Sequence, residues 1–364
     1  MKLAVLTASV APWSPGVIEA MLAGGLDINL VMFHPPGTAG YTSSIGQELV
    51  DRHRAIGSQL RAVHEIRGRG RGLGTYVRMV PELRRVTAQD DLILTLYGGG
   101  FGLAARLSGR PYAVYGSGSD ILRVRPELRW LTRTVLNRAV LVPCNGEAIT
   151  EAAKQLAPKA KVVCHLKGVN TDLYRPGERQ NERLEIVCSR GFQPVYDNET
   201  VVRSLGALAG LNFPWRMRFM AGGPGLEKAR ELLPPSVKER AEFIGGSTPA
   251  QVRDAFATSH VYVSMSKSDS TSMALLEALA SGMFPVVSDI PANRPWVNGG
   301  DRPGTLVPLG DADALGEALK VAATNHAGWA QAQALHPEHV RTEAHSVTQM
   351  RALGEKLAAA LAKQ

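Results

Sequence analysis

Short apolar runs alternate with helical segments along nearly the whole chain, and this alternation restricts the possible folds most. The runs are bounded by turn residues and do not alternate in polarity, which is typical of strands covered on both faces. They occupy residues 3–8, 28–33, 92–97, 112–115, 139–144, 160–165, 184–189, 215–222, 240–245, 260–265, 284–288 and 304–309. Segments between them, such as PELRWLTRTVLNRA and GEAITEAAKQLA, suit helices. The pattern predicts an α/β fold with parallel sheets and right-handed crossovers.

The alternation stops once, at residues 170–183, where NTDLYRPGERQNER is polar and has no periodicity. A chain of 364 residues is long enough for two domains. We therefore predict two Rossmann-like domains facing across a cleft, over 1–168 and 184–345, joined by a linker at 169–183. A terminal helix at 346–364 is expected to pack back on the first domain. Ligands of such sheets bind at the carboxyl ends of the strands, so function should lie at the cleft.

Positive charge is concentrated in the first half of the chain. Residues 1–170 hold 21 Lys and Arg against 12 Asp and Glu, whereas the remainder hold 20 against 21. Two interpretations of this excess are open. It forms either a solvated basic surface or a face that binds an anionic membrane or a phosphorylated acceptor. Nucleic acid is disfavoured, because the basic residues are not interleaved with aromatic ones and aromatic residues make up only 6%.

The N-terminus and the cysteines indicate a reducing, cytoplasmic environment. The first apolar run is too short for a signal peptide, and no stretch reaches 18 apolar residues. Cys144, Cys164 and Cys188 lack C-x-x-C spacing and end apolar runs. We interpret them as core residues and expect no metal site.

Two glycine-containing stretches follow strands and precede helices. In ASVAPWSPGVIEAML, Pro15 and Gly16 suit either a structural turn or a loop that approaches phosphate. In MAGGPGLEKA, Gly222 and Gly223 suit either a tight turn or close approach to a nucleotide. The chain has no G-x-G-x-x-G at its first turn, and it has no Walker A, kinase, H-E-x-x-H or G-x-S-x-G motif, so it lacks local support for dinucleotide binding, phosphoryl transfer and hydrolysis.

The stretch SMSKSDSTSMALLEALASGMFPVVSDI, residues 264–290, places two acids around a helix start. Its apolar stripe predicts a helix that begins after an N-cap among Ser270, Thr271 and Ser272 and ends at Gly282. Consecutive N–H groups and hydroxyls at this helix start would suit a diphosphate. Asp269, before the helix, would then accept hydroxyls of an attached sugar. Glu277, inside the helix, would accept those of a ribose, unless it simply faces solvent.

These residues resemble the donor-site motif of the GT4-type retaining glycosyltransferases, which have the GT-B fold. That motif has an acid, seven residues, a Glu and then A-x-A-S-G-x-P-V-V, and here Asp269 and Glu277 stand at the acids. KGVNTDLYRPGE, FMAGGPG and GTLVPLGDADALGEAL also resemble segments of the family in the same order. The likeness covers residues 165–325 well and the first half only in outline.

The resemblance implies sugar transfer from a nucleotide-diphosphate sugar, with a UDP-sugar favoured, to a glycan or lipid-linked acceptor of a cell-surface polysaccharide. Retention of the anomeric configuration without a metal ion or cofactor is implied too. By position, Arg190 matches the arginine that faces the diphosphate, Glu277 the residue on the ribose and Asp269 the residue on the sugar. Gly16 falls at the loop that approaches the phosphates. An acceptor on a lipid diphosphate would fit a protein that is peripheral on the inner face of the cell membrane.

The sequence departs from the family pattern at three places. Val195 stands where a Lys is common, so Lys267 is a candidate for the second positive charge. Asp269 replaces the more common Glu. On the acceptor side, Ser117 stands where a His is common, and Asp120 remains as a polar group. These departures leave two alternatives open, an epimerase of nucleotide sugars and a non-catalytic subunit that binds a sugar nucleotide.

Overall fold

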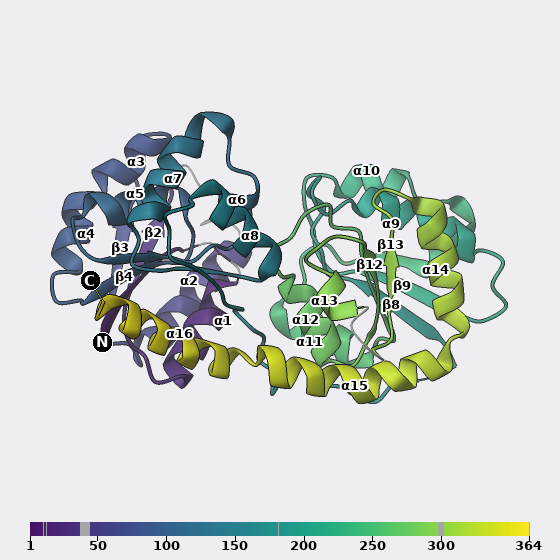
Figure 1. Cartoon of the computed structure of the whole chain (residues 1–364). Helices are drawn as coiled ribbons and strands as arrows, with labels where there is room; N and C mark the ends of the chain where they lie inside the picture. The colour runs from purple at the N-terminus through teal and green to yellow at the C-terminus, as the bar shows by residue number, and fades with distance from the viewer. Residues whose placement is uncertain (10, 12, 37–43, 181, 298–301, 364) are drawn as a thin grey trace. The chain divides into compact units, whose positions relative to one another are not determined.

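The computed structural model describes residues 1–9, 11, 13–36, 44–180, 182–297 and 302–363, which form two compact units (Figure 1). Unit 1 consists of Met1–Lys167 together with Ser346–Gln364, and unit 2 consists of Gly168–His345. The last helix of the chain is therefore part of the first unit.

Unit 1 is built on a five-stranded parallel sheet in the order β3-β2-β1-β4-β5. A separate parallel pair, β6 and β7, follows it in the chain. The strands are β1 (Lys2–Ala8), β2 (Asp27–His34), β3 (Ala62–Arg67), β4 (Leu92–Thr95), β5 (Tyr112–Val114), β6 (Val142–Cys144) and β7 (Val162–Cys164). The apolar runs predicted all of these except the edge strand β3.

Helices cover both faces of this sheet, which explains why its strands do not alternate in polarity. The helices are α1 (Ser14–Ala23), α2 (Ser44–Gly57), α3 (Leu73–Arg78), α4 (Val80–Val86), α5 (Gly99–Leu107), α6 (Ser119–Leu122), α7 (Arg129–Arg138), α8 (Glu147–Leu156) and α16 (Ser346–Leu361). One core packs α4, α5, α7 and α8 on one face, and a second core packs α1 and α16 on the other.

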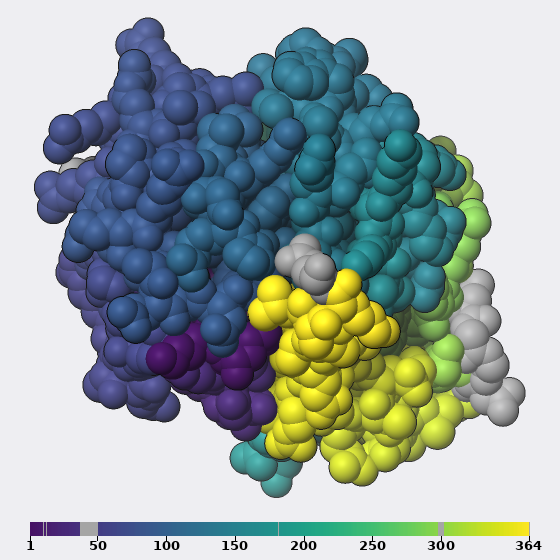
Figure 2. Space-filling view, turned by 60° about the vertical axis from the view of Figure 1, so that its left-hand side comes forward, coloured from purple at the N-terminus to yellow at the C-terminus, as the bar shows by residue number. Residues whose placement is uncertain are grey.

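The helix α16 is integrated closely into unit 1. Met350, Leu353 and Leu357 are fully buried in the core that α1 shares. A side chain at Gly24, which ends α1, would come within 3.0 Å of the Arg351 backbone nitrogen, so the two helices approach closely here. The space-filling view shows the C-terminal helix against the N-terminal segments (Figure 2).

Unit 2 has a six-stranded parallel sheet in the order β10-β9-β8-β11-β12-β13. Its strands are β8 (Leu184–Cys188), β9 (Trp215–Phe219), β10 (Ala241–Phe243), β11 (Val261–Ser264), β12 (Phe284–Ser288) and β13 (Thr305–Val307). Its helices are α9 (Asn198–Ser204), α10 (Leu226–Glu231), α11 (Pro249–Thr258), α12 (Met273–Ala280), α13 (Arg294–Val297), α14 (Ala312–Thr324) and α15 (His326–Ala344). Both sheets thus have the doubly wound parallel arrangement that the sequence predicts.

Residues 169–183, predicted as a linker, lie within unit 2. The Val169 N–H donates to the Ala344 carbonyl at 2.8 Å, and the Gly177 N–H donates to the Ala257 carbonyl at 3.0 Å. Arg179 donates to the carbonyls of Ser281 and Gly282, beyond the end of α12. The segment is polar because its groups satisfy carbonyls at helix ends, which have no partner within their own helix.

Candidate functional site

Unit 2 reverses its strand order between β8 and β11. The chain runs from β8 to β9 and β10 on one side and then returns to β11 on the other side of β8. In open α/β sheets, such a switch point leaves a crevice at the carboxyl ends of the two strands, where ligands bind. Arg190 follows β8, and Lys267 and Asp269 follow β11, so the structure brings these predicted residues to the switch point.

Arg190 joins the β8 loop to the loop before α12. Its Nη2 donates to Asp269 Oδ2 at 2.8 Å, and its Nη1 donates to Ser272 Oγ at 3.2 Å. The guanidinium also stacks on the Tyr196 ring, 4.0 Å from the ring centroid. Burial opposes the charge of Arg190, but the nearby Asp269 carboxylate helps to keep its pKa above the ordinary value. The result is a fixed positive group at the switch point.

The start of α12 lies directly beside this guanidinium. Ser272 is the N-cap, and its Oγ accepts a hydrogen bond from the Leu275 N–H at 3.2 Å. Ser270 and Thr271 are buried, and the Ser270 N–H donates to Asp269 Oδ1 at 3.0 Å. The first turn of a helix carries backbone N–H groups and the positive end of the helix dipole. An anion would therefore be stabilised here by both Arg190 and α12.

Glu277 lies in α12, one turn beyond the helix start, and is half-buried. Burial raises the pKa of this carboxyl group to about 7, against the opposing effects of a hydrogen bond with Tyr174 and the charge of Arg190. The Glu277 residue is half-buried, and its role at the ribose stays a prediction. Tyr174 comes from the segment predicted as a linker, which thus contributes a side chain beside this carboxylate.

Lys267 forms its ion pair with a different acid from Arg190. Its Nζ lies 3.4 Å from Asp197 Oδ2, and its side chain is about half exposed. Its backbone N–H donates at 2.8 Å to the carbonyl of Val195, the residue that stands where the family commonly has a Lys. Lys267 therefore neutralises Asp197 in this structure.

Gly222 and Gly223 pack against the protein's own backbone. A side chain at Gly222 would meet the Gly245 carbonyl oxygen at 3.2 Å. Gly223 has φ +146°, and a side chain there would meet the Phe192 nitrogen at 2.7 Å. The Gly222 carbonyl also accepts a hydrogen bond from the Phe192 N–H. This close packing accounts for the glycines without a ligand, and it supports the loop that carries Arg190.

In unit 1, Gly16 lies in the first turn of α1 rather than in a turn before it. The helix begins at Ser14, because proline is tolerated in the first turn, where its missing N–H costs no helical hydrogen bond. Gly16 is exposed, and a side chain built on it would meet nothing within 4 Å. Its approach to phosphates stays a prediction.

Asp120 and Ser117, the two acceptor-side candidates, are hydrogen bonded within unit 1. The Asp120 carboxylate accepts from the N–H groups of Gly98 at 2.8 Å, Gly118 at 2.7 Å and Ser117 at 3.1 Å. Burial raises the pKa of Asp120, while the Gly98 and Gly118 hydrogen bonds and the charge of Lys167 oppose the rise. Ser117 Oγ donates to the Leu96 carbonyl at 2.7 Å.

Lys167, which the sequence analysis did not single out, is a buried cation of unit 1. Its Nζ donates to Ser117 Oγ at 2.9 Å and lies 3.6 Å from the centroid of the Trp13 ring. The segment KGVNTDLYRPGE contains Lys167 and Tyr174, but nothing in it indicates their partners Ser117 and Glu277, which lie in distant segments. Tyr196 lies close in the sequence to its partner Arg190. A chemical signal was present only for Lys167, where a lysine occupies a mostly apolar stretch.

Comparisons with known structures define the class of fold. HepE from Anabaena in complex with UDP-glucose is similar with a TM-score of 0.79 at 15% identity, covering 99% of this chain and 100% of that chain. A glycosyltransferase from Rickettsia africae gives 0.77 at 13% identity, with coverage of 99% and 98%. Sucrose-phosphate synthase from Thermosynechococcus elongatus gives 0.75 at 17% identity, with coverage of 99% and 100%. The chain has the α/β fold of GT-B glycosyltransferases.

The match to a known protein family lies within the second unit. Residues 196–325 match the family described as glycosyl transferases group 1. The matched range includes Lys267, Asp269 and Glu277. A comparison of the sequence with curated proteins gives no match.

Two further properties concern only the described part of the chain. None of its helices is both long enough and apolar enough to cross a membrane. Within the same residues, no three His, Cys, Asp or Glu side chains are grouped so that they could hold a metal ion. The three cysteines are free thiols.

Proposed function

We propose that this protein transfers a sugar from a nucleotide-diphosphate sugar, a UDP-sugar in the first instance, to a hydroxyl group of a glycan or lipid-linked acceptor. The proposal depends on one observation: the Arg190 guanidinium is hydrogen bonded to both Asp269 and Ser272 at the start of α12. This arrangement combines a fixed cation, an acid and a helix N-terminus in one place. HepE, of similar fold, is described in complex with UDP and with UDP-glucose, which supports a donor of this class.

Each group has a role in this proposal. Arg190 and the first turn of α12 bind the diphosphate and stabilise the charge that develops on it as the leaving group. Asp269 neutralises Arg190 in the structure, so an incoming diphosphate competes for the guanidinium. The Asp269 carboxylate is then released to accept hydroxyls of the donor sugar. Glu277 accepts the two hydroxyls of the ribose.

The reaction we propose retains the configuration at the anomeric carbon. The bond from this carbon to the diphosphate oxygen breaks, and a bond to the acceptor oxygen forms on the same face. The acceptor hydroxyl loses its proton to an oxygen of the leaving diphosphate. Because positive groups of the protein stabilise that leaving group, the proposed reaction requires no metal ion and no cofactor other than the donor.

The acceptor side of the proposal rests on charge. Unit 1 contains the excess of Lys and Arg over Asp and Glu in residues 1–167, which favours an acceptor that is anionic or lies at an anionic membrane. A role in cell-surface polysaccharide synthesis, peripheral on the inner membrane face, would fit this charge.

Substitution of Arg190 and Glu277 tests the proposal. We expect Arg190→Ala and Glu277→Ala each to lower sugar transfer from UDP-glucose, or from whichever UDP-sugar raises the melting temperature, by about 100-fold or more. Arg341→Ala is the matched control, since Arg341 forms an exposed ion pair with Glu338 on α15. Near-normal turnover in both site variants would refute the assignment. Tight UDP binding without transfer to any membrane extract would instead favour the non-catalytic binding subunit.

A further inference from the structure

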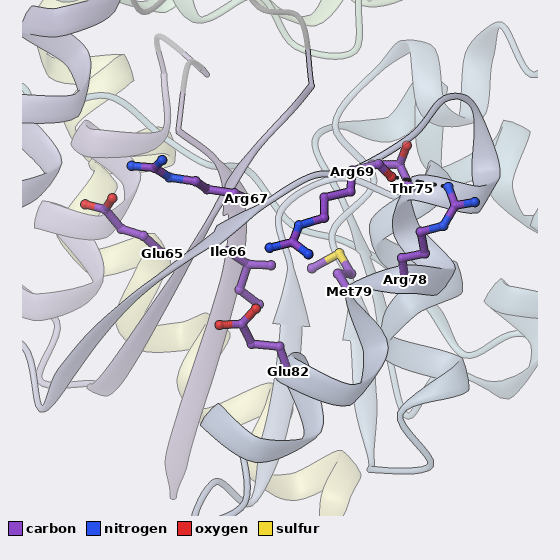
Figure 3. A pocket seen from close by; sticks show the side chains of 8 residues that line it. All are labelled: Glu65, Ile66, Arg67, Arg69, Thr75, Arg78, Met79 and Glu82. Carbon is purple, nitrogen blue, oxygen red and sulfur yellow. Dashed lines mark hydrogen bonds between the residues drawn. The ribbon is translucent and has the colours of Figure 1, made fainter.

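Unit 1 contains a cavity that none of the predicted site residues lines. Its volume is about 390 Å³, within the range of small-ligand sites. The lining residues come from the end of β3, the loop after it, and helices α3 and α4 (Figure 3). They are Glu65, Ile66, Arg67, Arg69, Thr75, Arg78, Met79 and Glu82. The cavity thus lies at the carboxyl end of a parallel strand, where α/β sheets bind ligands.

The arginines of this cavity have few partners. Among the described residues, neither Arg67 nor Arg69 forms an ion pair with a carboxylate, and Arg78 makes only a long hydrogen bond of 3.4 Å to the Arg69 carbonyl. The two glutamates are engaged elsewhere. Glu65 lies 3.0 Å from Arg54 Nη2, and Glu82 lies 3.6 Å from Arg85 Nη2. The cavity therefore has an excess of positive charge.

Glycine residues allow the loop after β3 to pass close to Arg78. Gly70 has φ +90°, in the region that favours glycine, and a side chain there would collide with the Arg78 guanidinium. Gly72, with φ +59°, precedes the first residue of α3. The alternating R-G-R-G-R-G sequence at 67–72 thus combines a tight loop with a series of guanidinium groups.

Thr75 provides a second and independent observation. Its residue is 3% exposed, it lines the cavity, and its Oγ1 is buried without a hydrogen-bond partner in the described structure. Buried hydroxyls are nearly always hydrogen bonded, and an unsatisfied one needs an explanation. A bound group would supply it if its binding uncovered Oγ1 and gave that hydroxyl an acceptor.

We infer that this cavity binds the phosphoryl group of a hydroxyl-bearing molecule. Guanidinium groups match phosphate oxygens in pairs of parallel hydrogen bonds, which favours phosphate over a simple halide or a neutral sugar. Glu65 and Glu82 disfavour a second anionic group on the ligand but can accept hydrogen bonds from sugar or polyol hydroxyls. The identification of this molecule as the acceptor rests on the proposed function, whereas phosphate binding itself does not.

The test measures binding of glycerol 3-phosphate to the full chain by calorimetry, in an Arg190→Ala background that removes the cation of the donor site. We expect Arg69→Ala to weaken binding at least tenfold. Thr75→Val should weaken it about threefold without lowering the melting temperature, because the lost hydroxyl has no hydrogen-bond partner in the described structure. Arg133→Ala is the control, because Arg133 is an exposed residue on α7 that forms no ion pair with any described residue.

Vesicles distinguish the two sources of the phosphate. Binding to phosphatidylglycerol vesicles that Arg69→Ala abolishes and glycerol 3-phosphate competes away would identify a lipid head group. Glycerol 3-phosphate binding without vesicle binding would identify a soluble phosphorylated molecule. The inference fails if neither probe binds, or if Arg69→Ala and Arg133→Ala have equal effects. If the unsubstituted protein does not bind UDP-glucose, the proposed function fails, but the inference of a phosphate site does not.

Discussion

Asp120 in unit 1 and Asp269 in unit 2 both follow strands of doubly wound sheets, yet their surroundings differ. Three backbone N–H groups donate to the Asp120 carboxylate, which is nearly inaccessible. Asp269 accepts from one backbone N–H and from the Arg190 guanidinium, and its side chain is 17% exposed. The number of backbone N–H donors therefore distinguishes the two acids. Asp120, with three donors, stabilises its own loop, whereas Asp269, with one, can exchange its partner for a ligand.

The same contrast holds for the cations. Lys167 in unit 1 is buried against the Trp13 ring and donates to Ser117. Arg190 in unit 2 pairs with an acid, and its Nε has no hydrogen-bond partner in the described structure. We therefore regard the polar groups near Asp120 as part of the framework of unit 1, and the group around Arg190 as the part that meets a ligand.

The largest effect that we expect from this comparison is on stability. Asp120→Ala would leave three backbone N–H groups without their acceptor in a buried place, which should lower the free energy of unfolding of unit 1 by about 3 kcal/mol. Urea denaturation measures this change. UDP-glucose binding should persist under native conditions. A variant of unchanged stability that loses only acceptor turnover would show that Asp120 contacts the acceptor.

A smaller effect should appear when donor binding is measured against pH. Burial raises the pKa of Glu277 from 4.5 to about 7. The ionised carboxylate is the form that accepts two ribose hydroxyls, so affinity should fall as the pH drops through 7, by about tenfold between pH 8 and pH 6. UDP-glucose is the appropriate ligand, because its diphosphate does not titrate in this range.

The control for this profile is Glu277→Gln, which cannot ionise and should bind UDP-glucose weakly, with an affinity that does not depend on pH in this range. If the affinity of the Gln variant for UDP-glucose still falls between pH 8 and pH 6, another group is responsible for the titration.

The same raised pKa of Glu277 makes the folded chain bind more protons than the unfolded chain between pH 4.5 and about 7. The contribution of this group to stability is therefore lost as the pH rises through that window.

The sequence predicted the parts of the fold that depend on local patterns. Strands buried on both faces give continuous apolar runs, so β8, β11 and their neighbours were predictable. The edge strand β3 was not, because RAVHEIR carries polar residues on a partly exposed edge. The segment 169–183 was interpreted as a linker for a similar reason, since its polar groups bind helix ends that are distant in the sequence.

The candidate site divides in the same way. Asp269, the Ser272 cap and Glu277 belong to one helix and its preceding loop, so spacing alone brings them together. Tyr174 lies about a hundred residues earlier, and only the folded chain places it beside Glu277. The ion-pair partner of Lys267 could not be predicted from the sequence either. Nothing in the spacing shows that Lys267 pairs with Asp197 rather than supplying a second positive charge beside Arg190.

Lys267 gives the smallest expected effect and the sharpest test of the difference between paired and available cations. Since its Nζ pairs with Asp197 and its side chain is half exposed, Lys267→Ala should lower transfer by less than about threefold. Arg190→Ala serves as the contrasting variant in the same assay. The companion variant is Asp197→Asn, because Asn tolerates the left-handed conformation of Asp197, with φ +49°. If Lys267 instead leaves Asp197 to act on the diphosphate, Asp197→Asn will raise transfer and Lys267→Ala will lower it as strongly as the loss of Arg190.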